Sequence, residues 1–322
     1  MDPGAFLRDL ERKPDSLRSL AGSLEDGVSL WPATVPSRVV MIGMGSSRYA
    51  ADAIATRLRA AGIDAVAELS SLQAGTPSGD DVLAVGISAS GETDETIEAL
   101  ARHRGASMTV ALTNRSGSAI ERAADSVVSM LAGDEEGGVA CSSFQHTLAL
   151  LLALEASASG GSHATVAGAV RKAAEASDDL LERRDSWLPP VADLLAVGTA
   201  TFSIAPVERL CSAEQGALML REGPRRTADA CESGDWLHVD LYLTKALNYR
   251  ALLFAGSRFD PAIMGWMRER GSKVVAVGGD VDSAHLTVRY RHDDDPTVVL
   301  LSEVLVAELL AARWWLERAD GP

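Results

Sequence analysis

Cysteine, aromatic and basic residues are scarce in this chain of 322 residues. It has three cysteines and no Cys-X-X-Cys pair, which argues against a zinc site or a disulfide scaffold and favours a reducing, cytoplasmic setting. Aromatic side chains make up 5% of the residues and hydrophobic ones 47%, so Ala, Val and Leu must form most of the core. The formal net charge of −15 disfavours nucleic acid as a partner, because a phosphate backbone needs a basic surface.

Long hydrophobic runs are also lacking. The longest, residues 148–154, is too short to cross a bilayer and is expected to be part of a buried helix. The N-terminal sequence MDPGAFLRDLERKPDSL is polar and charged, unlike a signal peptide. The acidic stretch at 291–296 is expected to be a solvated turn. The sequence therefore predicts a soluble protein that contacts no membrane and contains no metal or cofactor.

Apolar stretches of strand length alternate with stretches of helical periodicity along the chain. The predicted strands are 38–43, 65–69, 81–87, 108–112, 125–131, 193–197, 251–255 and 273–277. The predicted helices are 4–24, 48–61, 116–124, 206–221, 261–270 and 296–318, with more helix across 143–185. Such alternation is typical of parallel sheets covered by helices on both faces.

The second half of the chain repeats the strand and helix pattern of the first. The sequence Trp-Leu-Pro-Pro at 187–190 is predicted to break the first run, and the pattern restarts after it. We therefore expect an α/β fold with two doubly wound, parallel-sheet, flavodoxin-like lobes. The expected parts are an N-terminal helical segment at 1–35, a first lobe at 36–185 and a second lobe at 186–322. A single large sheet is the alternative.

Small and hydroxylated residues fill the stretch GISASGETDET at 86–96, between a predicted strand and a helix. In doubly wound folds, ligands bind where strands end and helices begin, and the amides of a helix N-terminus suit a phosphate. Similar stretches lie at 45–47 and 139–143. The alternative is that Ser90 or Thr93 simply caps the helix.

The corresponding stretch of the second half, residues 256–260, has one serine. Because the hydroxyls are concentrated in the first half, we expect one phosphate site per chain, in the first lobe.

These motifs together resemble the SIS (sugar isomerase) domain family. The resemblance is strongest to the tandem-SIS isomerase half of glucosamine-6-phosphate synthase and its stand-alone relatives, which include amino-sugar-phosphate deaminases and fructosamine deglycases. It extends over about residues 35–318 and depends on the sequences GMGSS, SASGETDET, TNRSGSAIERAAD, AGDEEGGVACSS and EQGALMLRE.

The resemblance implies a set of site residues. The residues that match the family's phosphate and sugar contacts are Ser46, Ser47, Ser88, Ser90, Thr93, Val139, Cys141 and Ser142. Glu222 matches the family's catalytic glutamate. His238, sixteen residues later, matches the histidine that opens the sugar ring and reaches into the partner's site across a dimer interface. The resemblance therefore also implies a homodimer with shared active sites.

The two residue types suit the chemistry that the family performs. A partly buried carboxylate can move a proton between C1 and C2 of a sugar, and histidine titrates near neutral pH. We expect Glu222 to face the ligand edge of its sheet. The alternatives are that Glu222 merely ends a surface helix and that His238 is half-buried beside Trp236.

The chain departs from the family pattern at several positions. Ala89 and Ser143 replace a glutamine and a lysine, and Gln215 replaces a glutamate. Position 2 is Asp2, where the glutaminase half of the synthase has its cysteine nucleophile, so no glutaminase domain is expected. The family's C-terminal lysine tail is not seen after Leu316, which favours deamination or deglycation.

The expected function is therefore an enzyme that acts on an amino sugar phosphate or a fructosamine phosphate, as a deaminase, isomerase or deglycase. Two alternatives stay open. One is a non-catalytic protein that binds a sugar phosphate or regulates in response to it. The other is a specialised isomerase of a secondary-metabolite pathway.

Overall fold

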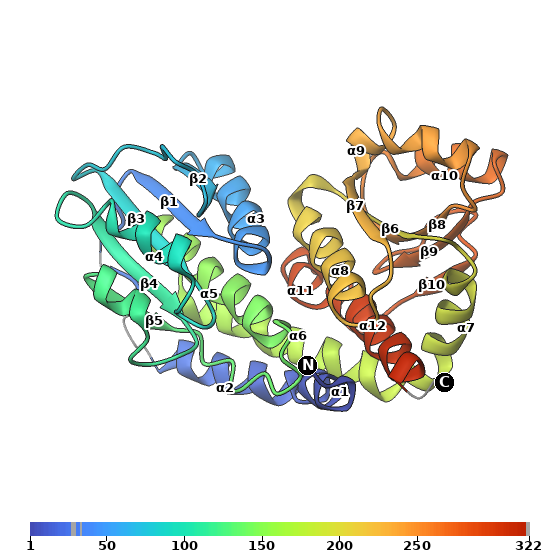
Figure 1. Ribbon diagram of the computed structural model, residues 1–322, viewed down its shortest axis with the longest axis horizontal. Coiled ribbons are helices and arrows are strands. Elements are labelled where there is room, and N and C mark those ends of the chain that lie inside the picture. The colour runs from blue at the N-terminus through green and yellow to red at the C-terminus, as the bar shows by residue number, and fades with distance from the viewer. Residues whose placement is uncertain (27–29, 33, 320–322) are drawn as a thin grey trace. The chain divides into compact units, whose positions relative to one another are not determined.

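Strands and helices alternate along most of the chain in the computed structural model, which describes residues 1–26, 30–32 and 34–319. The chain forms two compact units (Figure 1). The unit here called the first lobe consists of residues 16–134 and 142–171. The second lobe consists of residues 1–15, 135–141 and 172 onward.

The first lobe contains a five-stranded parallel sheet in the order β2-β1-β3-β4-β5. Its elements are β1 (Arg38–Gly43), α3 (Ser46–Ala60), β2 (Asp64–Leu69), β3 (Val82–Ile87), α4 (Asp94–Ala101), β4 (Met108–Thr113), the 3-10 helix η1 (Ala119–Ala123), β5 (Ser126–Ser129) and α5 (Ser142–Ala158). Most of α2 (Lys13–Glu25) and the start of α6 (His163–Glu182) also belong to it.

The second lobe repeats this arrangement. Its elements are α1 (Pro3–Glu11), α7 (Arg184–Ala196), β6 (Thr201–Ala205), η2 (Val207–Arg209), α8 (Leu210–Glu222), β7 (Ala228–Glu232), α9 (Ser233–Trp236), η3 (Asp240–Lys245), β8 (Arg250–Phe254), α10 (Asp260–Glu269), β9 (Lys273–Val277), β10 (Leu286–Val288), α11 (Pro296–Ser302) and α12 (Val304–Ala319). The sheet order is β10-β9-β8-β6-β7, and all pairs are parallel.

Both sheets follow one topology. Numbered within its own lobe, each has the strand order 2-1-3-4-5, which is the flavodoxin-like doubly wound order. The prediction of two doubly wound α/β lobes is therefore confirmed. The central strand β3 is buried along its whole length, as expected for a strand covered by helices on both faces.

Several predicted elements differ from the structure. Residues 193–197 were predicted as a strand, but α7 covers all but the last of them, and Pro189 and Pro190 lie inside this helix and do not break it. The buried residues of α7 are Trp187, Leu188, Val191, Ala192 and Leu195, which recur with helical spacing. The first strand of the second lobe is β6.

Two predicted helices are divided. The predicted helix 4–24 consists of α1 and α2, and the predicted helix 296–318 consists of α11 and α12. The apolar run at 148–154 lies in α5 and is buried, as predicted. Among the described residues, none of the helices has the length and apolar character needed to cross a membrane.

Candidate functional site

Residues 88–93, here called the serine turn, connect the carboxyl end of β3 to α4. Because Ile42 of β1 pairs with Gly86 of β3, the carboxyl ends of these two strands lie side by side. The turn that precedes α3 therefore starts at the same sheet edge. Ser46 and Ser47 are the first two residues of α3. The register thus brings two of the three hydroxylated stretches, 45–47 and 88–93, to one edge of this sheet.

The hydroxyl groups of the serine turn contact one another. Ser88 Oγ lies 3.0 Å from Thr93 Oγ1 and 3.4 Å from Ser90 Oγ. Two amides of the turn donate to these hydroxyls, from Gly91 to Ser88 at 3.1 Å and from Glu92 to Ser90 at 3.2 Å. Ser88 is buried and Ser90 is exposed, so the cluster extends from the lobe interior to its surface.

The alternative reading, that these hydroxyls cap α4, receives little support. Thr93 precedes α4, but within the described chain its side chain makes no capping hydrogen bond to the helix. Gly45 precedes α3 and has no side chain with which to cap it. Two helix N-termini at one sheet edge thus lack a side-chain cap, and such ends attract anions through their amides and dipoles.

Glycine is required inside the turn for two reasons. Gly91 has φ of +67°, a conformation that other residues seldom adopt, and a Cβ there would lie 2.1 Å from Ser118 Oγ. The carbonyl of Gly91 accepts a hydrogen bond from the amide of Ile120 at 2.9 Å, and Asn114 N donates to Ala89 O at 3.1 Å. The turn is therefore anchored to neighbouring backbone on two sides.

The predicted sugar contacts fall in different parts of the structure. Val139 and Cys141 lie in the segment 135–141, which belongs to the second lobe, whereas Ser142 starts α5 in the first lobe. Burial raises the pKa of the Cys141 thiol well above its ordinary value. The thiol stays protonated at neutral pH, so it is a poor nucleophile.

Glu222 is the last residue of α8 and is partly buried. Burial raises the pKa of its carboxyl group, while Arg225 and Arg221 act in the opposite direction. A carboxylate whose pKa is raised towards neutrality is a better proton-transfer group than an exposed one.

The expectation that Glu222 faces the carboxyl edge of its own sheet is wrong. Helix α8 starts near the carboxyl end of β6 and runs back along the sheet. Five residues after Glu222, Thr227 O accepts a hydrogen bond from Thr201 N at the start of β6. Glu222 therefore lies at the end of the lobe where the strands begin.

His238 lies in an exposed turn that follows α9. Its neighbour Trp236 is fully buried and donates from Nε1 to Tyr249 Oη at 2.9 Å. His238 is thus displayed at the surface, and the alternative that it is half-buried beside Trp236 does not hold. No hydrogen bond or ion pair between described residues joins His238 to Glu222, although both belong to the second lobe.

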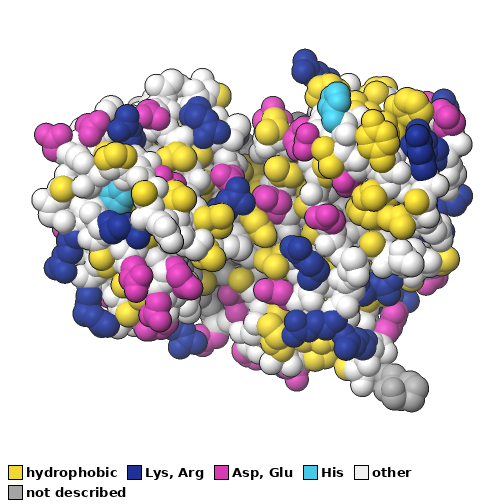
Figure 2. Space-filling view, turned by 45° about the horizontal axis from the view of Figure 1, so that its top comes forward, with side chains coloured by type: hydrophobic (Ala, Val, Ile, Leu, Met, Phe, Trp, Pro, Cys, Tyr) yellow, Lys and Arg dark blue, Asp and Glu magenta, His cyan; other side chains and the backbone are white. Residues whose placement is uncertain are grey.

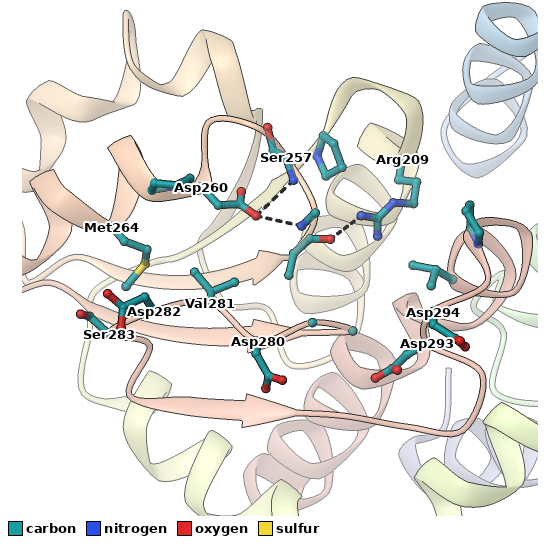
Figure 3. A pocket seen from close by; sticks show the side chains of 18 of the residues that line it. Arg209, Ser257, Asp260, Met264, Asp280, Val281, Asp282, Ser283, Asp293 and Asp294 are labelled. Atoms are coloured by element: carbon teal, nitrogen blue, oxygen red, sulfur yellow. Dashed lines mark hydrogen bonds between the residues drawn. The ribbon is translucent and has the colours of Figure 1, made fainter.

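The second lobe has a cavity of about 770 Å³ at the carboxyl edge of its sheet (Figure 3). There Asp260 Oδ2 accepts hydrogen bonds from the amides of Gly256, at 2.8 Å, and Ser257, at 3.1 Å. The protein's own carboxylate thus occupies two amides that a phosphate would use. The side chain of Arg209, also at this cavity, pairs with the buried carboxylate of Glu303.

This arrangement favours the predicted limit of one phosphate site per chain, because the second lobe supplies its own anion at the equivalent edge. Sequence reasoning missed the role of Asp260. The available signal was an acidic residue three positions after Ser257, at the start of a helix.

Comparisons with known proteins agree with the lobe architecture. Residues 34–157 match the model of the SIS domain family. The glutamine–fructose-6-phosphate aminotransferase (isomerizing) of Pyrobaculum aerophilum is 29% identical over 254 residues, which are 76% of this chain and 42% of the relative. The corresponding enzyme of Aeropyrum pernix is 28% identical over 85% of this chain and 47% of the relative. The chain thus spans about half the length of the curated relatives it matches.

Two solved structures share the fold over nearly the whole chain. The C-terminal domain of glucosamine-fructose-6-phosphate aminotransferase from Francisella tularensis superposes with a TM-score of 0.80 at 17% identity and covers 98% of each chain. Glucosamine-6-phosphate deaminase from Thermotoga maritima superposes with a TM-score of 0.76 at 16% identity, over 98% of this chain and 95% of the other.

Proposed function

On the premise that the chain carries an SIS domain at residues 34–157, we propose that it is an enzyme of sugar phosphates and that the serine turn binds the phosphate group. The observation that carries this proposal is the pair of uncapped helix N-termini, α3 and α4, beside a cluster of hydroxyls at one sheet edge. Backbone amides and hydroxyls can bind a phosphate without Lys or Arg, which suits a chain of net charge −15.

The proposed substrate is an amino sugar phosphate or a fructosamine phosphate. Two of the similar proteins are named for fructose 6-phosphate and glucosamine 6-phosphate. Deamination, isomerisation and deglycation of such sugars share one step, the transfer of a proton between C1 and C2 of the open chain. We propose that the chain catalyses this shared step.

Glu222 is the proposed group that accepts and returns this proton, and His238 is the proposed group that opens the sugar ring. The raised pKa of Glu222 supports the first role, since it makes the carboxylate a stronger base than an exposed one. The surface position of His238 supports the second, because an exposed imidazole can reach a substrate held elsewhere.

A homodimer is the proposed working unit. Large hydrophobic side chains lie exposed around His238, and Figure 2 shows hydrophobic side chains over the part of the second lobe that contains α9 and α10. The exposed hydrophobic residues of this region are Val239, Tyr242, Leu243, Leu247 and Trp266. Arg270, at the end of α10, links η3 to α10, because it donates to Leu241 O and stacks on Trp266. An exposed apolar surface of this kind is typical of a protein interface.

Turnover assays test the proposal most completely. Wild-type protein is incubated with fructose 6-phosphate, glucosamine 6-phosphate and fructosamine 6-phosphates, and release of ammonia or amine and deuterium uptake from heavy water are measured. Glu222→Gln keeps the size of the side chain but cannot accept a proton, so the rate is expected to fall by about 10²–10⁴-fold. Glu208→Gln, an exposed glutamate of the same lobe, is the matched control and should leave the rate unchanged.

The outcome also decides between the enzyme and the binding protein. If the wild type binds a sugar phosphate but shows neither turnover nor deuterium uptake, the proposal that the chain is an enzyme is contradicted. A regulatory or binding function would then be favoured.

A further inference from the structure

The segment 135–141 follows the first lobe's strand β5 in sequence but belongs to the second lobe, together with residues 1–15. It carries Val139 and Cys141, two of the proposed sugar contacts, and both side chains are buried. Its own fold is fixed in part by Glu135, whose Oε1 accepts a hydrogen bond from Cys141 N at 2.7 Å. Contacts from two helices of the second lobe hold the rest of the segment.

Helix α1 holds the first half of the segment. Gly137 N donates to Asp9 Oδ2 at 2.7 Å, and Asp2 N donates to Gly137 O at 3.2 Å. Asp9 is 1% exposed and also pairs with Arg12. The backbone of Gly137 lies directly against Phe6, since a Cβ at position 137 would be 2.5 Å from Phe6 Cα. Only glycine fits there without a shift of backbone.

Helix α8 contacts the second half through the side chain of Gln215. Gln215 Nε2 donates to Ala140 O at 2.8 Å, and Gln215 is completely buried. The Oε1 atom of the same amide finds no partner among the described residues. The amide nitrogen must therefore face Ala140, because a carbonyl oxygen in its place would oppose another carbonyl oxygen.

Gln215 and Glu222 lie on the same face of α8. They are seven residues apart, which is close to two helical turns. The face of the helix that holds the segment 135–141 thus also carries Glu222 at its end. One rigid element connects the buried loop with the carboxylate to which we assign proton transfer.

We propose that Gln215 is a positioning residue that fixes the segment 135–141 against α8. It thereby holds Val139 and Cys141 at a fixed position relative to Glu222. This inference rests on the function proposed above. Gln215 does not touch the reacting atoms; it acts through the main chain of Ala140. The serine turn belongs to the other lobe, so phosphate binding should be independent of Gln215.

Two variants of Gln215 test the inference. Gln215→Met keeps the volume and removes the donor, and Gln215→Glu keeps the shape but places an acceptor against Ala140 O. Gln73→Glu, which makes the same change at an exposed glutamine, is the matched control. Three properties are measured on the full chain: hydrogen exchange of the peptide spanning 135–141, affinity for inorganic phosphate, and kcat and KM on the sugar phosphate that the wild type turns over.

Both variants are expected to raise exchange in 135–141 about tenfold, the factor that corresponds to about 1.4 kcal/mol for one buried hydrogen bond. We expect kcat to fall by about ten- to a hundredfold through misplacement of the loop, with phosphate affinity unchanged. If Gln215 had a purely structural role, its substitution would lower the stability of the protein. It would not lower kcat while leaving phosphate affinity unchanged.

Unchanged exchange in 135–141 for Gln215→Met would overturn the inference, whatever the activity. Raised exchange with normal kcat would overturn it too, because the segment would then be irrelevant to turnover. If the wild type turns over no sugar phosphate, the proposed function and the positioning role fail together, while the exchange measurement still decides whether Gln215 holds the segment. Should Gln215→Glu fail to fold, Gln215→Met alone decides the outcome.

Discussion

Lys13 and Glu308 form an ion pair in which neither side chain is exposed to solvent. The pair joins the first residue of α2 to the middle of α12, 295 positions later in the chain. Burial raises the pKa of the Glu308 carboxyl group, and the Lys13 ammonium opposes this rise. Charges withdrawn from water in this way are stable only while both are present.

Removal of one partner should therefore be far worse than removal of both. Lys13→Met leaves Glu308 buried without its cation, and the free energy of unfolding should fall by about 3–5 kcal/mol. The double variant Lys13→Met/Glu308→Leu should recover most of this loss. Urea denaturation of the three proteins checks the prediction, and a double variant as unstable as Lys13→Met would contradict it.

Gly137 should tolerate no side chain. Gly137→Ala places a Cβ against the backbone of Phe6, and overpacking of this kind costs about 1–3 kcal/mol. Gly22→Ala is the matched control, because Gly22 lies inside α2 with open space around its Cβ position. That change should stabilise the protein by about 0.5–1 kcal/mol. Thermal unfolding of both variants is the measurement, and equal shifts would show that the contact with Phe6 is unimportant.

Stability should depend on pH through Glu303. Complete burial raises the pKa of Glu303 to about 7, although its partner Arg209 acts to lower it. The pKa of Glu303 is about 4.3 in the unfolded chain and about 7 in the folded protein. At a pH between these two values, the native carboxyl group holds a proton that the unfolded chain has lost. Its contribution to stability is thus complete below about pH 4.3, falls as the pH rises, and is lost above about 7.

Glu303→Gln removes this titration. The difference in free energy of unfolding, variant minus wild type, should rise by about 3–4 kcal/mol as the pH is raised from 4 to 8. The exposed Glu269→Gln should show no such change. A constant difference between Glu303→Gln and wild type across this range would show that Glu303 does not titrate there.

The second lobe should bind no phosphate while Asp260 is intact. Calorimetry with wild type is expected to give one phosphate per chain. Asp260→Ala frees the amides of Gly256 and Ser257 and should add a second, weaker site. Asp282→Ala removes an exposed carboxylate from the same cavity and should add none. Two phosphates per wild-type chain would refute this account of the second lobe.

The sequence was sufficient for the fold class and for the buried strands β1, β3 and β8, which are continuous apolar stretches. The buried strand β6 was missed, because the strand was placed at 193–197 instead. The edge strands β7 and β10 were missed, since they are short and partly exposed and so lack that signal. The α7 error had a different cause. Pro189 and Pro190 suggested a break, yet helical spacing of the buried residues continued across them.

The serine turn could be predicted because its residues are consecutive in the sequence. The contacts that hold the segment 135–141 could not be predicted, because Asp9 and Gln215 are distant from it along the chain. The motif that contains Gln215 does not show which backbone group its side chain contacts. The position of Glu222 follows from the direction of α8, which starts near the carboxyl end of β6 and runs back along the sheet. Because β6 was missed from the sequence, this direction was not used.

Binding of a sugar phosphate to the serine turn is the most direct test of the account. Affinities for fructose 6-phosphate and for fructose are measured by calorimetry with wild type, Ser88→Ala/Ser90→Ala and the control Ser71→Ala/Ser78→Ala, whose two serines are exposed. Wild type and control should bind only the phosphorylated sugar. The turn variant loses hydrogen bonds to a charged group, each worth about 1.5–3 kcal/mol, so its binding should be weaker by at least about tenfold. Equal affinity of the turn variant and wild type would contradict the claim that the serine turn holds the phosphate.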